Sequence, residues 1–385
     1  MSTKDVLLVG LGAVGTIYSY ILQSSKLARV TTVARSNYDI INAKGINIRS
    51  KKYGTHESWR PYRLVSSVAE AADRPYSYVI LTTKAIPEVI KTSRVLEPLL
   101  SSPYSERHPQ PTYVLLQNGL GVERDLYHSV KALNQGEPKI ISTVVWIGTN
   151  LVEKNVVEHT DFDRITIGMY RHGDHLTTTN SPEEDAILTD LGTMLKTGGS
   201  EVTIATEIQR KKFAKTFWNI AFSSFSTLTG SPPTAMFRPP PKEGQSYSPY
   251  VAPQTAPNII PVLRAILQEM ITLGNFELYD LSACLTFFLG RALGYPDNED
   301  GLPSSLVDNT ILRTAELHKD PAHTALPSML LDAQNGLPIE VEVILGEVVR
   351  LAKEMGVDVP RIETLYALLA IIQNQTLGGL RQPKL

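Results

Sequence analysis

A glycine-rich turn near the amino terminus constrains the fold of this chain more than any other feature of its sequence. The turn matches the pattern G-x-G-x-x-G and reads Gly10-Leu11-Gly12-Ala13-Val14-Gly15. The apolar run Val6–Val9 precedes it and a helical pattern follows it, which is the context that the pattern requires in a dinucleotide-binding fold. Gly10 would permit the tight turn, Gly12 would admit a pyrophosphate, and Gly15 would let the helix pack closely on the sheet. The alternative, three incidental glycines in a turn, fits this context poorly.

The residue that follows the second apolar run indicates which dinucleotide would bind. Enzymes that bind NAD place an Asp or Glu about 20 residues beyond the glycines, where it holds the ribose 2′-hydroxyl. Here Val30–Val33 is followed by Ala34 and Arg35, so no acid stands at the strand end. A guanidinium can pair with a 2′-phosphate, so Arg35 predicts NADP(H). The alternative is an arginine that only faces solvent.

The first half of the chain alternates short apolar runs with helical patterns. Five nearly continuous apolar or β-branched runs are expected to be buried parallel strands: Val6–Val9, Val30–Val33, Val79–Thr82, Val114–Gln117 and Ile140–Trp146. We expect Val156–His159 and Ile165–Gly168 to form an added hairpin. Ser181-Pro182-Glu183-Glu184 is typical of a capped helix start. The pattern predicts an α/β, Rossmann-like doubly wound domain over residues 1–205.

The second half, residues 206–385, is predicted to be an all-α domain. Apolar spacing indicates helices at Glu207–Leu228, Asn258–Leu273, Glu277–Leu293, Ser304–Leu317 and Pro338–Met355. The last of these has the clearest apolar stripe, formed by Val341, Ile344, Leu345, Val348 and Ala352, and Gly356 stands where a helix cap belongs. A Pro-rich insertion at 230–257 cannot be a helix interior. Long irregular segments are functional or mobile, and we favour the mobile interpretation here.

Composition narrows the class of protein. Thirty-seven basic and 39 acidic residues leave a formal net charge of −2, so no overall field attracts nucleic acid or an anionic membrane. Cys284 is the only cysteine, which excludes an intramolecular disulfide, and no histidine or cysteine spacing suggests a metal site. The apolar runs are too short to span a bilayer and the start does not resemble a signal peptide. We therefore expect a cytoplasmic protein.

Several polar residues stand where chemistry is expected. Lys84 and Asn118 follow predicted strands, and ligands of doubly wound sheets bind outside the carboxyl ends of strands. Lys215, Asn219 and Ser223 have the spacing i, i+4, i+8 and would share one face of a helix. Glu340 borders an apolar stripe, where a carboxylate needs a partner. The alternatives are turn residues at Lys84 and Asn118, a solvated basic face that includes Lys211 and Lys212, and an exposed glutamate at a helix start.

Taken together, these segments resemble the ketopantoate reductase (2-dehydropantoate 2-reductase) family. The resemblance runs along the whole chain through Gly10–Gly15, Thr82-Thr83-Lys84-Ala85, Gln117-Asn118-Gly119-Leu120-Gly121, Lys215–Asn219, and Ser328-Met329-Leu330-Leu331-Asp332 with Glu340. It implies an NADPH-dependent reductase that converts a 2-oxo acid, ketopantoate or a relative, into the 2-hydroxy acid. It also implies a homodimer.

The resemblance assigns a role to each candidate residue. Lys215 would polarise the ketone and donate the proton, and Glu340 would bind the substrate's hydroxyl. Asn118 would hold the substrate near the cofactor, Lys84 would lie close to the nicotinamide, and Asn219, Ser223 and Ser328 would bind substrate. An ammonium placed where negative charge develops stabilises the transition state more than the ground state.

The chain departs from the family at several of these positions. Leu345 stands in place of an asparagine, Ser223 in place of a second one, and Ala325 and Pro327 at usually polar sites. Because such a site would be less polar, we expect a more apolar or bulkier 2-oxo acid than ketopantoate. Two other functions remain open: a related opine-type dehydrogenase, and a non-catalytic NADP-binding sensor or scaffold.

Overall fold

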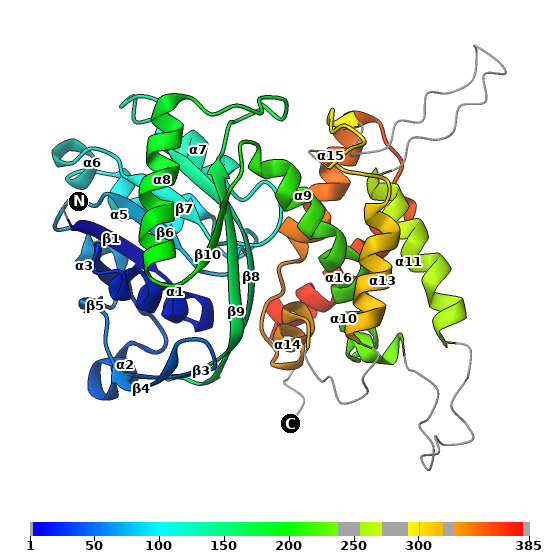
Figure 1. Ribbon diagram of the computed structural model, residues 1–385, viewed down its shortest axis with the longest axis horizontal. Helices are drawn as coiled ribbons and strands as arrows, with labels where there is room; N and C mark the ends of the chain where they lie inside the picture. Colours follow the sequence, from blue (N-terminus) through cyan, green and yellow to red (C-terminus); the bar gives the residue numbers. More distant parts are fainter. Residues whose placement is uncertain (1–2, 238–254, 272–291, 300, 319–325, 380–385) are drawn as a thin grey trace. The chain divides into compact units, whose positions relative to one another are not determined.

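The computed structural model describes residues 3–237, 255–271, 292–299, 301–318 and 326–379 (Figure 1). The chain forms two compact units, which divide between Lys212 and Phe213, whereas the sequence pattern placed the boundary between residues 205 and 206. None of the helices in these described ranges combines the length and the apolar character needed to cross a membrane.

Unit 1 is built on one ten-stranded sheet. Its strands are β1 (Lys4–Val9), β2 (Ala28–Val33), β3 (Ile46–Ser50), β4 (Gly54–Trp59), β5 (Arg63–Val65), β6 (Tyr78–Leu81), β7 (Thr112–Leu115), β8 (Ile140–Glu153), β9 (Val156–Met169) and β10 (Glu201–Ile204). They run in the order β4-β3-β9-β8-β7-β6-β1-β2-β5, and β10 pairs with β9. The strands from β8 to β5 are parallel, while β9 is antiparallel to β8. The predicted doubly wound sheet is therefore confirmed.

The five predicted strands are confirmed as β1, β2, β6, β7 and β8. Strands β6 and β7 are buried along their whole length, which explains their continuous apolar sequence. Four strands were not predicted: β3, β4, β5 and β10. Two of them, β4 and β10, are mostly exposed and carry a weak apolar pattern.

The predicted hairpin is wrong. Its two runs belong to the single strand β9, and the hairpin is formed by β8 and β9. Asp161 and Asp163 separate the two runs, and this makes the sequence resemble a turn. Asp163 is nevertheless buried within the strand, because Lys52 Nζ pairs with its carboxylate at 2.8 Å and the Tyr53 hydroxyl donates to it.

Helices cover the sheet of unit 1. They are α1 (Ala13–Ser24), α2 (Tyr38–Lys44), α3 (Val68–Ala71), α4 (Thr92–Val95), α5 (Glu97–Leu100), α6 (Tyr104–Arg107), α7 (Arg124–Lys131) and α8 (Pro182–Thr197). Helices α1 and α8 contact each other and both pack against β9 (Figure 1). The predicted start of α8 is confirmed: Ser181 and Glu184 form a reciprocal capping box and Pro182 occupies the first turn.

Every element assigned in the described part of unit 2 is a helix. Helix α9 (Ile208–Trp218) enters this unit and is followed by the π-helix η1 (Asn219–Ser223) and by α10 (Ser224–Thr229). The others are η2 (Pro233–Ala235), α11 (Thr255–Ile271), α13 (Leu306–Leu317), α14 (Ser328–Gln334), the π-helix η3 (Glu342–Gly346), α15 (Glu347–Met355) and α16 (Pro360–Leu377). The predicted all-α character is confirmed for these residues, and α16 is an addition to it.

Three further predictions for unit 2 concern its apolar stripe, the helix at 277–293 and the Pro-rich insertion. The five residues of the predicted apolar stripe are all buried, and Gly356 caps α15 in the left-handed conformation, with φ of 67°. The helix expected at 277–293 lies almost wholly outside the described residues. Helix α11 begins at Thr255, so the last three residues of the predicted Pro-rich insertion are helical. The triple proline of that insertion lies outside the described residues.

Candidate functional site

The predicted cofactor residues of unit 1 gather at one edge of its sheet. Strands β2, β1, β6 and β7 are consecutive and parallel, so their carboxyl ends meet there. We call this the carboxyl edge. The glycine-rich turn follows β1, Arg35 follows β2, Lys84 follows β6, and Asn118 follows β7. Ligands of doubly wound sheets bind at such an edge, beside the strand where the order reverses.

The three glycines of the turn do different work. Gly10 has φ of 107°, and a Cβ there would lie 2.9 Å from Thr83 Cγ2. A Cβ on Gly15 would overlap the main-chain oxygen of Gly10. A Cβ on Gly12 would meet nothing within 4 Å. Gly10 and Gly15 therefore serve the packing of the turn, while the lack of a side chain at Gly12 leaves space that no atom of the described residues fills.

Helix α1 opens directly from this turn. Gly12 is its N-cap residue, and no side chain caps the helix. The first turn of α1 contains no acidic residue, so its partial positive charge is not offset locally. Backbone N–H groups and the open space at Gly12 thus fit a pyrophosphate. The Asn37 side chain also holds the turn, since its Nδ2 donates to the Leu11 carbonyl at 2.7 Å.

The end of β2 carries no carboxylate. Ala34 is buried, Arg35 is exposed, and the next acid along the chain, Asp39, lies inside helix α2. Among the described residues, no hydrogen bond or ion pair engages the Arg35 guanidinium. Its exposure alone is also compatible with the alternative of a solvated arginine, so the role of Arg35 stays a prediction.

Lys84 and Asn118 occupy equivalent places on neighbouring strands. Leu81 pairs in register with Leu115, and each of the two polar residues stands three positions beyond that pair. Lys84 is exposed and Asn118 is half-buried. The structure thus brings both residues to the carboxyl edge, as the sequence predicts. It also shows a contact that the sequence did not indicate: Gln117 Nε2 donates to the Thr83 carbonyl at 3.1 Å.

The remaining predicted site residues belong to unit 2. Asn219 and Ser223 begin and end η1, Ser328 begins α14, and Glu340 stands just before η3. Element η1 contacts both α14 and η3. The structure therefore brings these four residues into one group of elements. Lys215 lies one helical turn before Asn219 on α9 and is half-buried.

The helix that carries Lys215, Asn219 and Ser223 changes its hydrogen-bond pattern between them. Residues Asn219–Ser223 form a π-helix, with i→i+5 hydrogen bonds, so the shared face of the three side chains stays a prediction. Ser223 is 2% exposed, whereas Lys215 and Asn219 are half-buried. A second π-helix, η3, lies in contact with η1. Single π-helical turns are frequent at functional sites, and the sequence gives no signal for either of them.

The burial of Glu340 shows whether it is an exposed glutamate at a helix start. The residue is 4% exposed, and its carbonyl accepts the Ile344 amide at 3.1 Å, so it stands at a helix start but not in solvent. The alternative of an exposed glutamate is wrong. Among the positions that depart from the family, Leu345 is completely buried, Pro327 is buried, and Ala325 lies outside the described residues.

A buried ion pair near the carboxyl edge was not predicted from the sequence. Lys212 Nζ contacts the Glu123 carboxylate, and the two side chains are 3% and 0% exposed. One alternative in the sequence analysis placed Lys212 on a solvated basic face. Because Lys212 is buried, it does not belong to such a face. Burial alone would raise the pKa of Glu123, but the charge of Lys212 and hydrogen bonds from Lys212 and Ser142 outweigh it and hold the pKa below its ordinary value.

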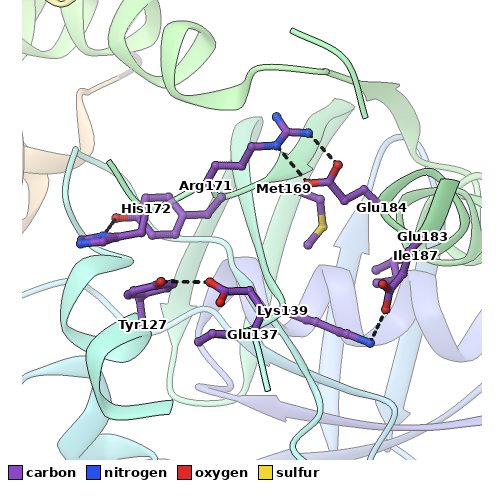
Figure 2. Close-up of a pocket in the computed structure, with 11 residues that line it drawn as sticks. Tyr127, Glu137, Lys139, Met169, Arg171, His172, Glu183, Glu184 and Ile187 are labelled. Atoms are coloured by element: carbon purple, nitrogen blue, oxygen red, sulfur yellow. Dashed lines mark hydrogen bonds and ion pairs between the residues drawn. The ribbon is translucent and has the colours of Figure 1, made fainter. Parts of the chain in front are cut away.

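A hollow of about 290 Å³ opens at the opposite edge of the sheet (Figure 2). Met169 pairs with Ile141 at the start of β8, so the hollow lies at the amino ends of the parallel strands. Four of its charged side chains pair with one another, Lys139 with Glu183 at 2.7 Å and Arg171 with Glu184 at 2.9 Å. This hollow is therefore distinct from the glycine-rich turn. In the described ranges, no three or more His, Cys, Asp or Glu side chains are arranged to hold a metal ion.

Comparison with known proteins extends over both units. A family model described as "Ketopantoate reductase PanE/ApbA" matches residues 6–172, and one described as "Ketopantoate reductase PanE/ApbA C terminal" matches residues 207–373. An uncharacterized protein of Saccharomyces cerevisiae is 25% identical over 383 residues, which cover 96% of this chain and 93% of its own length.

Solved structures share the fold, and two of them illustrate its range. The 2-dehydropantoate 2-reductase of Methylococcus capsulatus is 24% identical, with 97% of each chain covered and a TM-score of 0.70. A D-mandelate dehydrogenase, solved with NADH and anilino(oxo)acetate, is 16% identical, with 97% of this chain and 99% of its own covered and a TM-score of 0.69. The two family models span most of the sequence, from the glycine-rich turn to helix α16. The chain therefore belongs to the ketopantoate reductase family.

Proposed function

We propose that this protein is an NADPH-dependent reductase that converts the ketone of a 2-oxo acid into the 2-hydroxy acid. The observation that carries the proposal is the open space at Gly12, which faces an uncapped helix N-terminus at the end of β1. Such a site binds a pyrophosphate through backbone N–H groups and the helix dipole. The family to which the chain belongs supports the reductase chemistry.

The proposed preference for NADPH depends on the end of β2. The D-mandelate dehydrogenase of the same fold was solved with NADH, so the fold alone does not determine whether NADH or NADPH binds. The choice depends instead on the side chain that meets the adenosine ribose. Arg35 is exposed there and no acid stands at the end of the strand, which favours a 2′-phosphate over a 2′-hydroxyl.

The proposed proton donor is Lys215. NADPH, when bound, supplies a hydride, so the carbonyl carbon gains a hydride and the carbonyl oxygen must gain a proton. Lys215 would donate that proton, and its ammonium would stabilise the negative charge that develops on the oxygen. Asn118 would orient the substrate, and Lys84 would lie on the nicotinamide side. Asn219, Ser223, Ser328 and Glu340 would hold the polar groups of the substrate.

We propose a substrate that is more apolar or bulkier than ketopantoate. Recognition of the hydroxyl of ketopantoate requires buried polar partners, and unpaired buried groups cost about 1–3 kcal/mol each. Leu345 is completely buried at a position where the resemblance implies an asparagine. The D-mandelate dehydrogenase that shares the fold was solved with anilino(oxo)acetate, whose anilino group is aromatic. A less polar site is consistent with a substrate of that kind.

Steady-state kinetics test this proposal. NADPH consumption is measured with ketopantoate, 2-oxoisovalerate and larger branched or aromatic 2-oxo acids. We expect turnover, with the highest kcat/KM for one of the larger apolar acids. If ketopantoate is by far the best substrate, the proposed apolar site is wrong. NADPH binding without turnover of any 2-oxo acid would instead support a non-catalytic sensor or scaffold.

A further inference from the structure

Gln117 is a buried side chain at the carboxyl edge that the proposed chemistry does not use. It stands two residues beyond the end of β7 and directly before Asn118. The side chain is 6% exposed. A polar group buried to this extent is normally satisfied by hydrogen bonds on all of its strong donors and acceptors.

One half of the Gln117 amide is satisfied. Its Nε2 donates to the Thr83 carbonyl at 3.1 Å and contacts Thr83 Oγ1 at 3.3 Å. These contacts also fix the orientation of the amide, because a main-chain carbonyl accepts hydrogen bonds and cannot donate one. The nitrogen must face Thr83, so the oxygen must face away from it.

The other half is not satisfied. Gln117 Oε1 is buried and has no hydrogen-bond partner among the described residues. A buried acceptor left unpaired costs about 1–3 kcal/mol, so a donor from a bound ligand would stabilise this oxygen. The neighbourhood indicates where such a donor would come from. Thr83 lies against Gly10, since a Cβ on Gly10 would be 3.0 Å from the Thr83 amide nitrogen.

The strand order identifies the half of the cofactor that would lie nearby. The pyrophosphate would bind at the turn after β1, and the adenosine ribose would lie beside β2. Strands β6 and β7 lie on the other side of β1, so the nicotinamide half of a bound dinucleotide would extend over their ends. Gln117 and Thr83 follow these two strands.

We propose that Gln117 Oε1 accepts a hydrogen bond from the nicotinamide half of the bound cofactor, either from its carboxamide amino group or from the adjoining ribose. This inference depends on the proposed function, because it assumes that NADP(H) binds at the carboxyl edge. It makes Gln117 a cofactor-binding residue. It also explains why a glutamine stands beside Asn118. The Gln117 nitrogen donates to Thr83 in the loop after β6, and the Gln117 oxygen would accept a hydrogen bond from the cofactor.

Equilibrium binding of three ligands tests the proposal. The ligands are NADP+, 2′-phospho-ADP-ribose, which lacks the nicotinamide, and adenosine 2′,5′-bisphosphate, which also lacks the second ribose. We expect Gln117→Met to weaken NADP+ binding by about tenfold. Binding of adenosine 2′,5′-bisphosphate should change by less than about twofold. Weakened binding of 2′-phospho-ADP-ribose would assign the donor to the ribose, and unchanged binding would assign it to the carboxamide.

Gln110→Met is the matched control. Gln110 precedes the same strand, and both ends of its amide are engaged, with the Leu99 carbonyl at 3.1 Å and the Tyr113 hydroxyl at 2.7 Å. This variant should leave the binding of all three ligands unchanged. Equal losses for NADP+ and the bisphosphate in Gln117→Met, or no loss at all, would overturn the inference. If the wild-type chain binds none of the three ligands, the proposed function itself fails.

A measurement on the wild-type chain covers the case in which Gln117→Met does not fold. The side-chain amide resonances of Gln117 should shift in the NMR spectrum on addition of NADP+ and stay unchanged with adenosine 2′,5′-bisphosphate. Resonances that stay unchanged with both ligands would overturn the inference.

Discussion

Lys212 of helix α9 and Glu123 of the segment that follows Asn118 form an ion pair inside unit 1, with almost no exposure to solvent. Ser142 and Gln209 also donate to the same carboxylate oxygen. The second oxygen of Glu123 has no hydrogen-bond partner among the described residues. Attraction between buried charges is strong, but so is the cost of removing them from water, so the pair matters most when one member is missing.

Removal of one partner should therefore destabilise the protein more than removal of both. We expect Lys212→Met or Glu123→Gln to lower the free energy of unfolding by about 3–5 kcal/mol. The double variant Glu123→Gln/Lys212→Met should lose clearly less than either single variant, because no buried charge is left unpaired. Chemical denaturation of the four proteins measures this coupling. Additive losses would show that the two side chains do not act as a pair.

The same pair should make stability depend on pH. The pKa of folded Glu123 lies below its ordinary value of 4.5, so the carboxylate contributes stability above that value. The contribution is lost as the pH falls through the lowered folded pKa, because the carboxylate becomes protonated. Unfolding measured from neutral pH down into this acid range should show a smaller loss for Glu123→Gln than for the wild type. Parallel pH profiles of the two proteins would contradict the assignment.

Two glycines of the same turn should respond oppositely to alanine. Gly12→Ala meets no atom of the described residues within 4 Å and should change stability by less than about 1 kcal/mol in either direction. It should nevertheless weaken NADPH binding at least tenfold, because the methyl group would occupy the space proposed for the pyrophosphate. Gly15→Ala overlaps the Gly10 carbonyl and should cost about 1–3 kcal/mol or more of stability. Thermal unfolding and NADPH titration separate the two effects; unchanged NADPH affinity in Gly12→Ala would remove the basis of the proposed site.

Arg35 should set the cofactor preference. The wild type is expected to bind NADPH more than tenfold more tightly than NADH, a difference of about 1.4 kcal/mol or more. Arg35→Ala should remove most of this difference and leave NADH binding nearly unchanged, since the guanidinium would contact only the 2′-phosphate. Titration of both cofactors against both proteins measures the ratio. Equal affinities in the wild type would show that Arg35 is a solvated surface arginine.

Much of the fold could be predicted because its central strands are buried on both faces. A strand such as β6 can be apolar at every position, and this pattern is readable without a structure. The same reasoning fails where tertiary contacts compensate for polar residues. Asp163 interrupts the apolar pattern of β9, and the sequence does not show that Lys52 lies beside it. The strand β10 was not predicted for a different reason: it is mostly exposed, so its sequence has little apolar pattern.

The candidate site was predicted where a residue follows a strand or borders a helix stripe. This was enough to find the turn at Gly10, the equivalent positions of Lys84 and Asn118, and the border position of Glu340. It was not enough to find the π-helix at Asn219, because the same apolar pattern fits an α-helix. Nor did it find Gln117, because the unpaired acceptor of its amide becomes visible only when every neighbouring donor has been placed.

Turnover of Lys215→Ala tests the central claim most directly. The kcat for the best 2-oxo acid is measured by the loss of NADPH absorbance, beside NADPH affinity, in the wild type and in this variant. Loss of a general acid should lower kcat by roughly a hundredfold or more and leave NADPH affinity nearly unchanged. Wild-type turnover in Lys215→Ala would contradict the account and show that the reduction takes place at another site.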